Sequence, residues 1–188
     1  MSLLIIGLVV FLGVHCLPAL PKVRADLATR LGEGRYKGLF SAVSALGLVL
    51  IVVGFARAPS TERVFAPFPA AIAIAPYAVT LAIILVAAAN MRGYIRQRLR
   101  HPMLLGLLIW ASVHLLANGD LRGTLLFGGF LAYAAIDLVS ATKRQAVKVF
   151  VPSIKFDVMA IVGGIAVAVA IMVFHRLLFG VPAVSFGV

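Results

Sequence analysis

The chain has 188 residues, of which 63% are hydrophobic and only 12% are charged. This composition lies outside the range of soluble globular domains, so we expect one domain, residues 1–188, embedded in a lipid bilayer. The net charge of +11 does not indicate nucleic-acid binding, because the basic residues occupy short runs between apolar segments, where they would face anionic lipid.

Six apolar segments are long enough to cross a bilayer as helices, and none alternates as a barrel strand does. They cover Ser2–Leu20, Lys37–Arg57, Phe68–Asn90, Pro102–Asn118, Leu121–Ser140 and Asp157–Phe179. The sequence therefore predicts an all-α fold, a polytopic bundle of about six transmembrane helices. The first segment lacks the basic start of a secretory signal, so we expect it to be retained as a helix.

The connectors between these segments predict an orientation. Most of the 17 lysines and arginines lie in the first, third and fifth connectors: Lys22, Arg24, Arg30, Arg35, Lys37, Arg92, Arg96, Arg98, Arg100, Lys143, Arg144, Lys148 and Lys155. The others are Arg57, Arg63, Arg122 and Arg176. The positive-inside rule places the basic connectors in the cytoplasm and both termini in the periplasm of a bacterial inner membrane.

Three connectors carry further expectations. In the first, apolar residues recur at helical spacing between basic ones, which predicts a short interfacial helix ending at Gly32-Glu33-Gly34. In the third, residues 91–101, the run R-x-x-x-R-x-R-x-R is either solvated and lipid-facing or a site for a phosphate-bearing ligand. The fifth, residues 141–156, is expected to lie along the inner membrane surface.

The fourth apolar segment combines two histidines with the only tryptophan. Pro102 suits the first turn of a helix, and Asn118-Gly119 suits its end. About 16 residues lie between these signals, which is near the lower limit for crossing a bilayer. A histidine inside such a segment is costly without a partner, so His114 is a candidate functional residue.

The four histidines are His15, His101, His114 and His175. At about 1.5 Å of rise per residue, His114 and His175 should lie at similar depth. On the same estimate, His15 is separated along the membrane normal from His114 by roughly 12 Å and from His101 by roughly 9 Å. Helix boundaries carry errors of several ångströms, so this estimate leaves open which pair meets.

Two interpretations of the histidines remain open. His15 and His114 either form buried hydrogen bonds between helices or are axial ligands of a haem between helices. The chain has no C-x-x-C-H sequence, so such a haem would be haem b; the single cysteine, Cys16, excludes an internal disulfide. For His101 and His175 the alternative to ligand binding is an interfacial position.

Asp137 is a further ionisable group inside an apolar segment, near the inner end of the fifth. Lys143, Arg144 or Arg100 could pair with it, and a proton-handling role is the alternative. The chain has six acidic residues, and no nucleophile–base pair, phosphate-binding loop or metal-binding carboxylate cluster is present. The residue pattern therefore identifies no catalytic residue.

Four separated motifs resemble the NnrU family. They are L-L-I-I-G-L-V-V-F-L-G-V-H, R-L-G-E-G-R-Y-K-G-L-F-S, R-H-P-M-L-L-G…W-x-x-x-H-L-L-A-N-G and H-R-L-L-F-G-V-P, in order from end to end of the chain. The family takes its name from gene clusters for nitrite and nitric oxide reduction. The resemblance therefore implies an integral membrane protein that supports denitrification-linked redox metabolism.

The NnrU family is also similar to plant zeta-carotene isomerase, a membrane enzyme with haem b that isomerises a cis double bond. By this resemblance His15 and His114 match the axial ligands of the isomerase, and His101 matches the histidine of its R-H-P motif. The isomerase has a cysteine three residues before the second ligand, where this chain has Ala111, which argues against redox-linked ligand exchange. The resemblance therefore pairs His114 with His15 as ligands, whereas the estimated depths in the membrane pair His114 with His175.

Three functions follow as hypotheses. The first is an NnrU-type protein that holds one haem b and supports nitrite and nitric oxide metabolism. The second is a haem-dependent cis–trans isomerase of a carotenoid or another isoprenoid substrate. The third is a non-catalytic assembly partner of a respiratory reductase, in which the histidines are structural.

Overall fold

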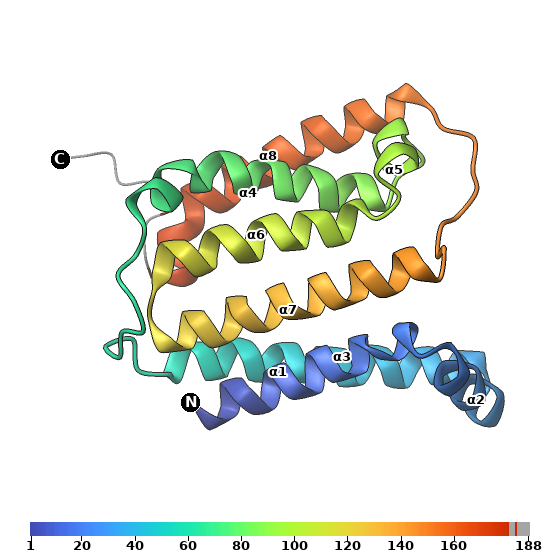
Figure 1. Cartoon of the computed structure of the whole chain (residues 1–188), viewed down its shortest axis with the longest axis horizontal. Coiled ribbons are helices and arrows are strands. Elements are labelled where there is room, and N and C mark those ends of the chain that lie inside the picture. Colours follow the sequence, from blue (N-terminus) through green and yellow to red (C-terminus); the bar gives the residue numbers. More distant parts are fainter. Residues whose placement is uncertain (181–182, 184–188) are drawn as a thin grey trace.

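The computed structural model describes residues 1–180 and 183, and this part of the chain forms a bundle of helices (Figure 1). The elements are α1 (Ser2–His15), the 3₁₀ turn η1 (Leu17–Ala19), α2 (Pro21–Leu31), α3 (Glu33–Arg57), α4 (Pro69–Ala89), α5 (Tyr94–Leu99), α6 (Pro102–Asn118), α7 (Leu121–Lys143) and α8 (Ile154–Phe179). Five segments are long and apolar enough to cross a membrane, namely α1 with η1, α3, α4, α7 and α8. The sixth predicted span, α6, is a shorter apolar helix of 17 residues. The all-α polytopic prediction is confirmed.

Several boundaries differ from the prediction. The first α-helix ends at His15 rather than at Leu20, because Pro18 has no amide hydrogen to continue it and the chain turns into η1. The expected interfacial helix is α2, and a single glycine, Gly32 with φ 79°, separates it from α3. Three long helices extend past the expected bounds: α3 begins at Glu33, α7 ends at Lys143 and α8 begins at Ile154.

The helices pack in a chain of neighbours rather than around one central axis. In order of contact they are α3, α1, α7, α6, α4 and α8. Figure 1 shows α7 between the α1–α3 pair and the group formed by α4, α6 and α8. Any cofactor site that used residues of both α1 and α6 would therefore have to involve α7 as well.

Glycines allow a close contact between α1 and α3. A Cβ added to Gly47 would lie 2.8 Å from the backbone nitrogen of Phe11, and one added to Gly7 would lie 2.6 Å from that of Ile51. A Cβ on Gly54 would collide with the backbone of Leu4. Lipid gives helices no hydrophobic reason to associate, so close backbone approach and dispersion contacts stabilise such a pair.

The basic connectors gather at one end of the bundle. Figure 1 shows α2, α5 and residues 144–153 at this end, which we call the basic end. The start of α1, the connector 58–68 and the turn from α6 to α7 lie at the opposite end. The structure thus places the predicted basic connectors together, while the side of the membrane that they face stays a prediction.

Replacing Gly47 by alanine should separate α1 from α3 and lower the thermal unfolding midpoint of the detergent-solubilised protein. Overpacking of this kind costs about 1–3 kcal/mol. The matched control is Gly38→Ala on the same helix, where an added Cβ meets nothing within 4 Å. Equal midpoints for the two variants would contradict the close contact between these helices.

Candidate functional site

His114 lies near the end of α6, in contact with aromatic rings. Its ring centroid is 5.2 Å from that of Trp110 and 4.9 Å from that of Phe127, a residue of α7. Its Nδ1 atom lies 2.9 Å from the carbonyl oxygen of Trp110. Because a carbonyl only accepts, Nδ1 carries the hydrogen, and the neutral ring keeps its lone pair on Nε2. A histidine that binds a metal through Nε2 is oriented in this way.

His15 repeats this arrangement at the end of α1. Its Nδ1 atom lies 2.7 Å from the carbonyl oxygen of Phe11, four residues earlier, and its ring stacks on the Phe11 ring at 4.2 Å. Phe40 of α3 and Tyr133 of α7 complete the aromatic surroundings. Both histidines that the resemblance singled out therefore have the same tautomer, fixed by their own helices.

One phenylalanine, Phe130 of α7, lies between the two histidine sites. Its ring centroid is 5.8 Å from that of Phe11 and 5.6 Å from that of Trp110. His15 comes four residues after Phe11, and His114 comes four residues after Trp110. Each histidine is therefore about 6 Å further along its helix axis than the ring that contacts Phe130. Since α1 and α6 run in opposite directions (Figure 1), the backbones of His15 and His114 diverge from Phe130 towards opposite ends of the bundle.

His175 of α8 is the other histidine near His114. Its ring is half-buried and lies 4.8 Å from the ring of Phe179. The end of α8 lies at the same end of the bundle as the end of α6, opposite the basic end (Figure 1). His114 and His175 therefore lie near the same end of the bundle, and whether they share a ligand stays a prediction.

His101 lies at the opposite end of α6 from His114 and is the cap residue of that helix. The preceding Arg100 has φ 62° and ψ −50°, and the His101 amide donates to the carbonyl of Leu99 at 2.6 Å. These values define a γ-turn with positive φ, a strained conformation for a residue with a side chain. The R-H-P motif is therefore a sharp turn at the basic end, at the opposite end of α6 from His114.

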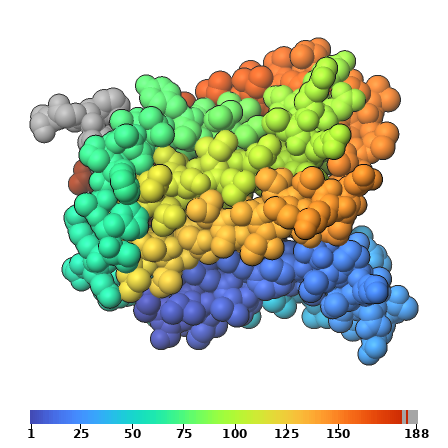
Figure 2. Space-filling model, viewed as in Figure 1, coloured from blue at the N-terminus to red at the C-terminus, as the bar shows by residue number. Residues whose placement is uncertain are grey.

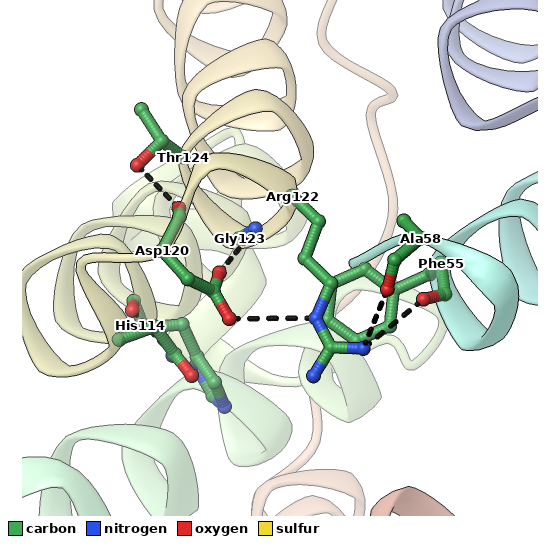
Figure 3. A network of polar contacts seen from close by, with 8 residues as sticks. Phe55, Ala58, His114, Asp120, Arg122, Gly123 and Thr124 are labelled. Carbon is green, nitrogen blue, oxygen red and sulfur yellow. Dashed lines mark hydrogen bonds and ion pairs between the residues drawn. The ribbon is translucent and has the colours of Figure 1, made fainter. Parts of the chain in front are cut away.

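A polar network closes the end of the bundle near His114 (Figure 3). Asp120 caps α7, since its Oδ1 accepts from the Gly123 amide at 2.7 Å. Arg122 lies 3.4 Å from Asp120 and donates to the carbonyl of Phe55, in the last turn of α3, at 3.3 Å and to that of Ala58, the residue after α3, at 3.4 Å. Its guanidinium also lies over the Phe55 ring. Arg122 thereby joins α3 to α7.

Asp137 forms a second polar group near the basic end. Its carboxylate lies 3.4 Å from Arg144, which is one of the three predicted partners. The hydroxyl of Tyr133 lies 3.4 Å from Asp137 and 3.4 Å from the carbonyl oxygen of His15. Tyr133 was missed from the sequence, where a lone tyrosine in an apolar helix gives no signal of its partners.

Asp157 was considered only as a helix boundary, but it is the one buried charged side chain in the part of the chain that the structure describes. It is 4% exposed and accepts from the amides of Tyr94 and Ile95 at 2.8 and 3.0 Å. These bonds cap α5, a six-residue helix inside the segment that we expected to be a connector. The partners are more than 60 positions apart in sequence, so no local pattern could indicate them.

The fold places the chain among polytopic α-helical membrane proteins, with histidines held in aromatic surroundings. The family model described as NnrU protein matches residues 3–183. This match covers nearly the whole sequence, so the chain belongs to the NnrU family, as the four motifs indicated. No curated protein and no solved structure matches the chain.

Replacing Arg122 by methionine should lower the unfolding midpoint, because two carbonyls at the end of α3 and the Asp120 carboxylate lose their partner. Leaving buried polar groups unpaired costs about 1–3 kcal/mol. The matched control is Arg176→Met on the exposed face of α8. Thermal unfolding in one detergent would measure both variants, and an Arg122 variant as stable as the control would show that the network contributes nothing.

Proposed function

We propose that this NnrU-family protein holds haem b in a bacterial inner membrane, with His114 as one axial ligand. The observation that carries the proposal is the geometry of the His114 ring. Its Nδ1 hydrogen is held by the Trp110 carbonyl, so the Nε2 lone pair is available for a metal. The rings of Trp110 and Phe127 supply an apolar surface that suits a flat macrocycle.

A haem fits the donor set better than a metal ion bound by protein groups alone. Among the residues that the structure describes, no three His, Cys, Asp or Glu side chains gather as a metal site. A porphyrin brings four nitrogen ligands of its own and requires only one or two histidines from the protein. Isolated histidines with defined tautomers therefore match the requirement of a haem.

Two residues compete for the second axial position. The family resemblance proposes His15, whose tautomer matches that of His114. The position of His175 near the end of α8, at the same end of the bundle as the end of α6, favours His175. In the present packing the rings of Phe11, Phe130 and Trp110 separate His15 from His114, so pairing these two requires α1 and α6 to shift.

The proposed role is support of nitrite and nitric oxide metabolism by electron transfer. If His114 and a second histidine held haem b, the haem would supply one-electron redox chemistry. Ala111 stands where the isomerase has a cysteine three residues before the second ligand, so we favour electron transfer to a respiratory reductase over isomerisation of an isoprenoid. The residues of the chain would orient the ligands through the Trp110 and Phe11 carbonyls and exclude water with aromatic rings.

Absorption spectra of the detergent-purified protein, oxidised and reduced, test the haem proposal. We expect a Soret band that His114→Ala abolishes or shifts, while His101→Ala at the far end of α6 leaves it unchanged. The second ligand is the residue, His175 or His15, whose alanine variant reproduces the effect of His114→Ala. Protein from haem-sufficient cells without a Soret band would overturn the proposal.

The proposed orientation places the basic end in the cytoplasm, following the positive-inside rule. Because Cys16 is the only cysteine, a Cys16→Ser background permits single-cysteine labelling with a membrane-impermeant maleimide. Ser60→Cys, in the connector 58–68, should react in intact spheroplasts. Gln145→Cys, after α7, should react only once the membrane is opened. The reverse pattern would invert the topology.

A further inference from the structure

A surface hollow of about 400 Å³ lies at the basic end of the bundle. It is lined by Asn90, Arg92, Arg96, Lys148, Val149 and Phe150. These residues come from the end of α4, from α5 with the residue before its cap, and from the connector after α7. Figure 2 shows α5, in yellow-green, packed against the orange connector at this end. Three of the six lining residues are basic and none is acidic.

The hollow is held in shape by contacts from outside its lining. The buried carboxylate of Asp157 caps α5, as described above. The amide of Ser153 donates to the carbonyl of Arg92 at 3.0 Å, which fixes the connector against the start of α5. Within the lining, the Arg96 guanidinium lies 5.2 Å from the centre of the Phe150 ring. The backbone around the hollow and the Arg96 side chain are therefore positioned by the fold.

The positive charges in the hollow are not neutralised by the ion pairs of the protein. None of the ion pairs in the described part of the chain includes Arg92, Arg96 or Lys148. Asp157 forms no ion pair with any of the three, and its carboxylate oxygens accept from the amides of Tyr94 and Ile95. Placing like charges close together raises the free energy of the protein, and a bound anion lowers it again by attracting them. The chemistry of the hollow thus selects an anionic group, and arginine favours phosphate.

The surroundings indicate where that phosphate comes from. Val149 and Val151, close to Lys148 in the same connector, are 101% and 88% exposed. Acyl chains would cover them while a headgroup occupied the hollow. We propose that the hollow binds the headgroup phosphate of an anionic phospholipid of the adjacent leaflet. This site is independent of the histidines and does not depend on haem binding.

Lipid titration followed by native mass spectrometry tests the proposal on the full-length protein. The probes are phosphatidylglycerol, which is anionic, and phosphatidylcholine, which has no net charge. We expect tighter binding of phosphatidylglycerol. Arg96→Gln and Lys148→Gln should each weaken that binding about fivefold, and the double variant about 25-fold. The matched control is Arg98→Gln, because Arg98 lies on the same short helix but does not line the hollow.

The control separates a site from general surface charge. Equal losses for Arg98→Gln and Arg96→Gln, or no loss for any variant, would overturn the proposal. Competition by millimolar inorganic phosphate without a preference for phosphatidylglycerol would also overturn it and identify a soluble phosphate as the ligand. Thermal unfolding of each variant checks folding. If Arg96→Gln fails to fold, Arg96→Lys and Lys148→Gln decide the outcome, because Lys148 lies in an exposed connector.

Discussion

The structure depends on one constraint, that backbone groups at a helix end in or near lipid must find partners within the protein. The chain has only six acidic residues, and two of them satisfy helix starts: Asp120 caps α7 and Asp157 caps α5. Arg122 satisfies the end of α3. Asp157 and Arg122 also join two elements, α8 with α5 and α7 with the end of α3, so these scarce polar side chains help to position the apolar helices.

The sequence predicted those features that depend on local chemistry. Pro102 begins α6, and Gly119 ends it with φ 73°, as expected from the special conformations that these two residues favour. The early end of α1 was missed, although Pro18 was visible, because hydropathy continues unchanged past it. The capping of α5 by Asp157 could not have been predicted, since it depends on the packing of α8 against a distant segment.

The histidines illustrate the same division between local and long-range information. Their type and spacing indicated candidate ligands, and the resemblance chose His15 and His114. Their tautomers could not be read from the sequence, since they depend on the bonds to the carbonyls of Phe11 and Trp110. Nor could the sequence place Phe130 between the two rings, because its position depends on α7 lying between α1 and α6.

The short length of α6 explains how His114 can lie near a helix end and still be surrounded by rings. A helix of 17 residues is about 25 Å long, shorter than the hydrocarbon core of a bilayer. The connector 58–68 covers its end: the Phe68 amide donates to the Leu116 carbonyl at 3.0 Å, and the Val64 amide donates to the Gly119 carbonyl at 2.9 Å. The turn after α6 is thus recessed beneath this connector. A shortened helix under a folded connector creates a sheltered polar position without placing an unpaired group in lipid.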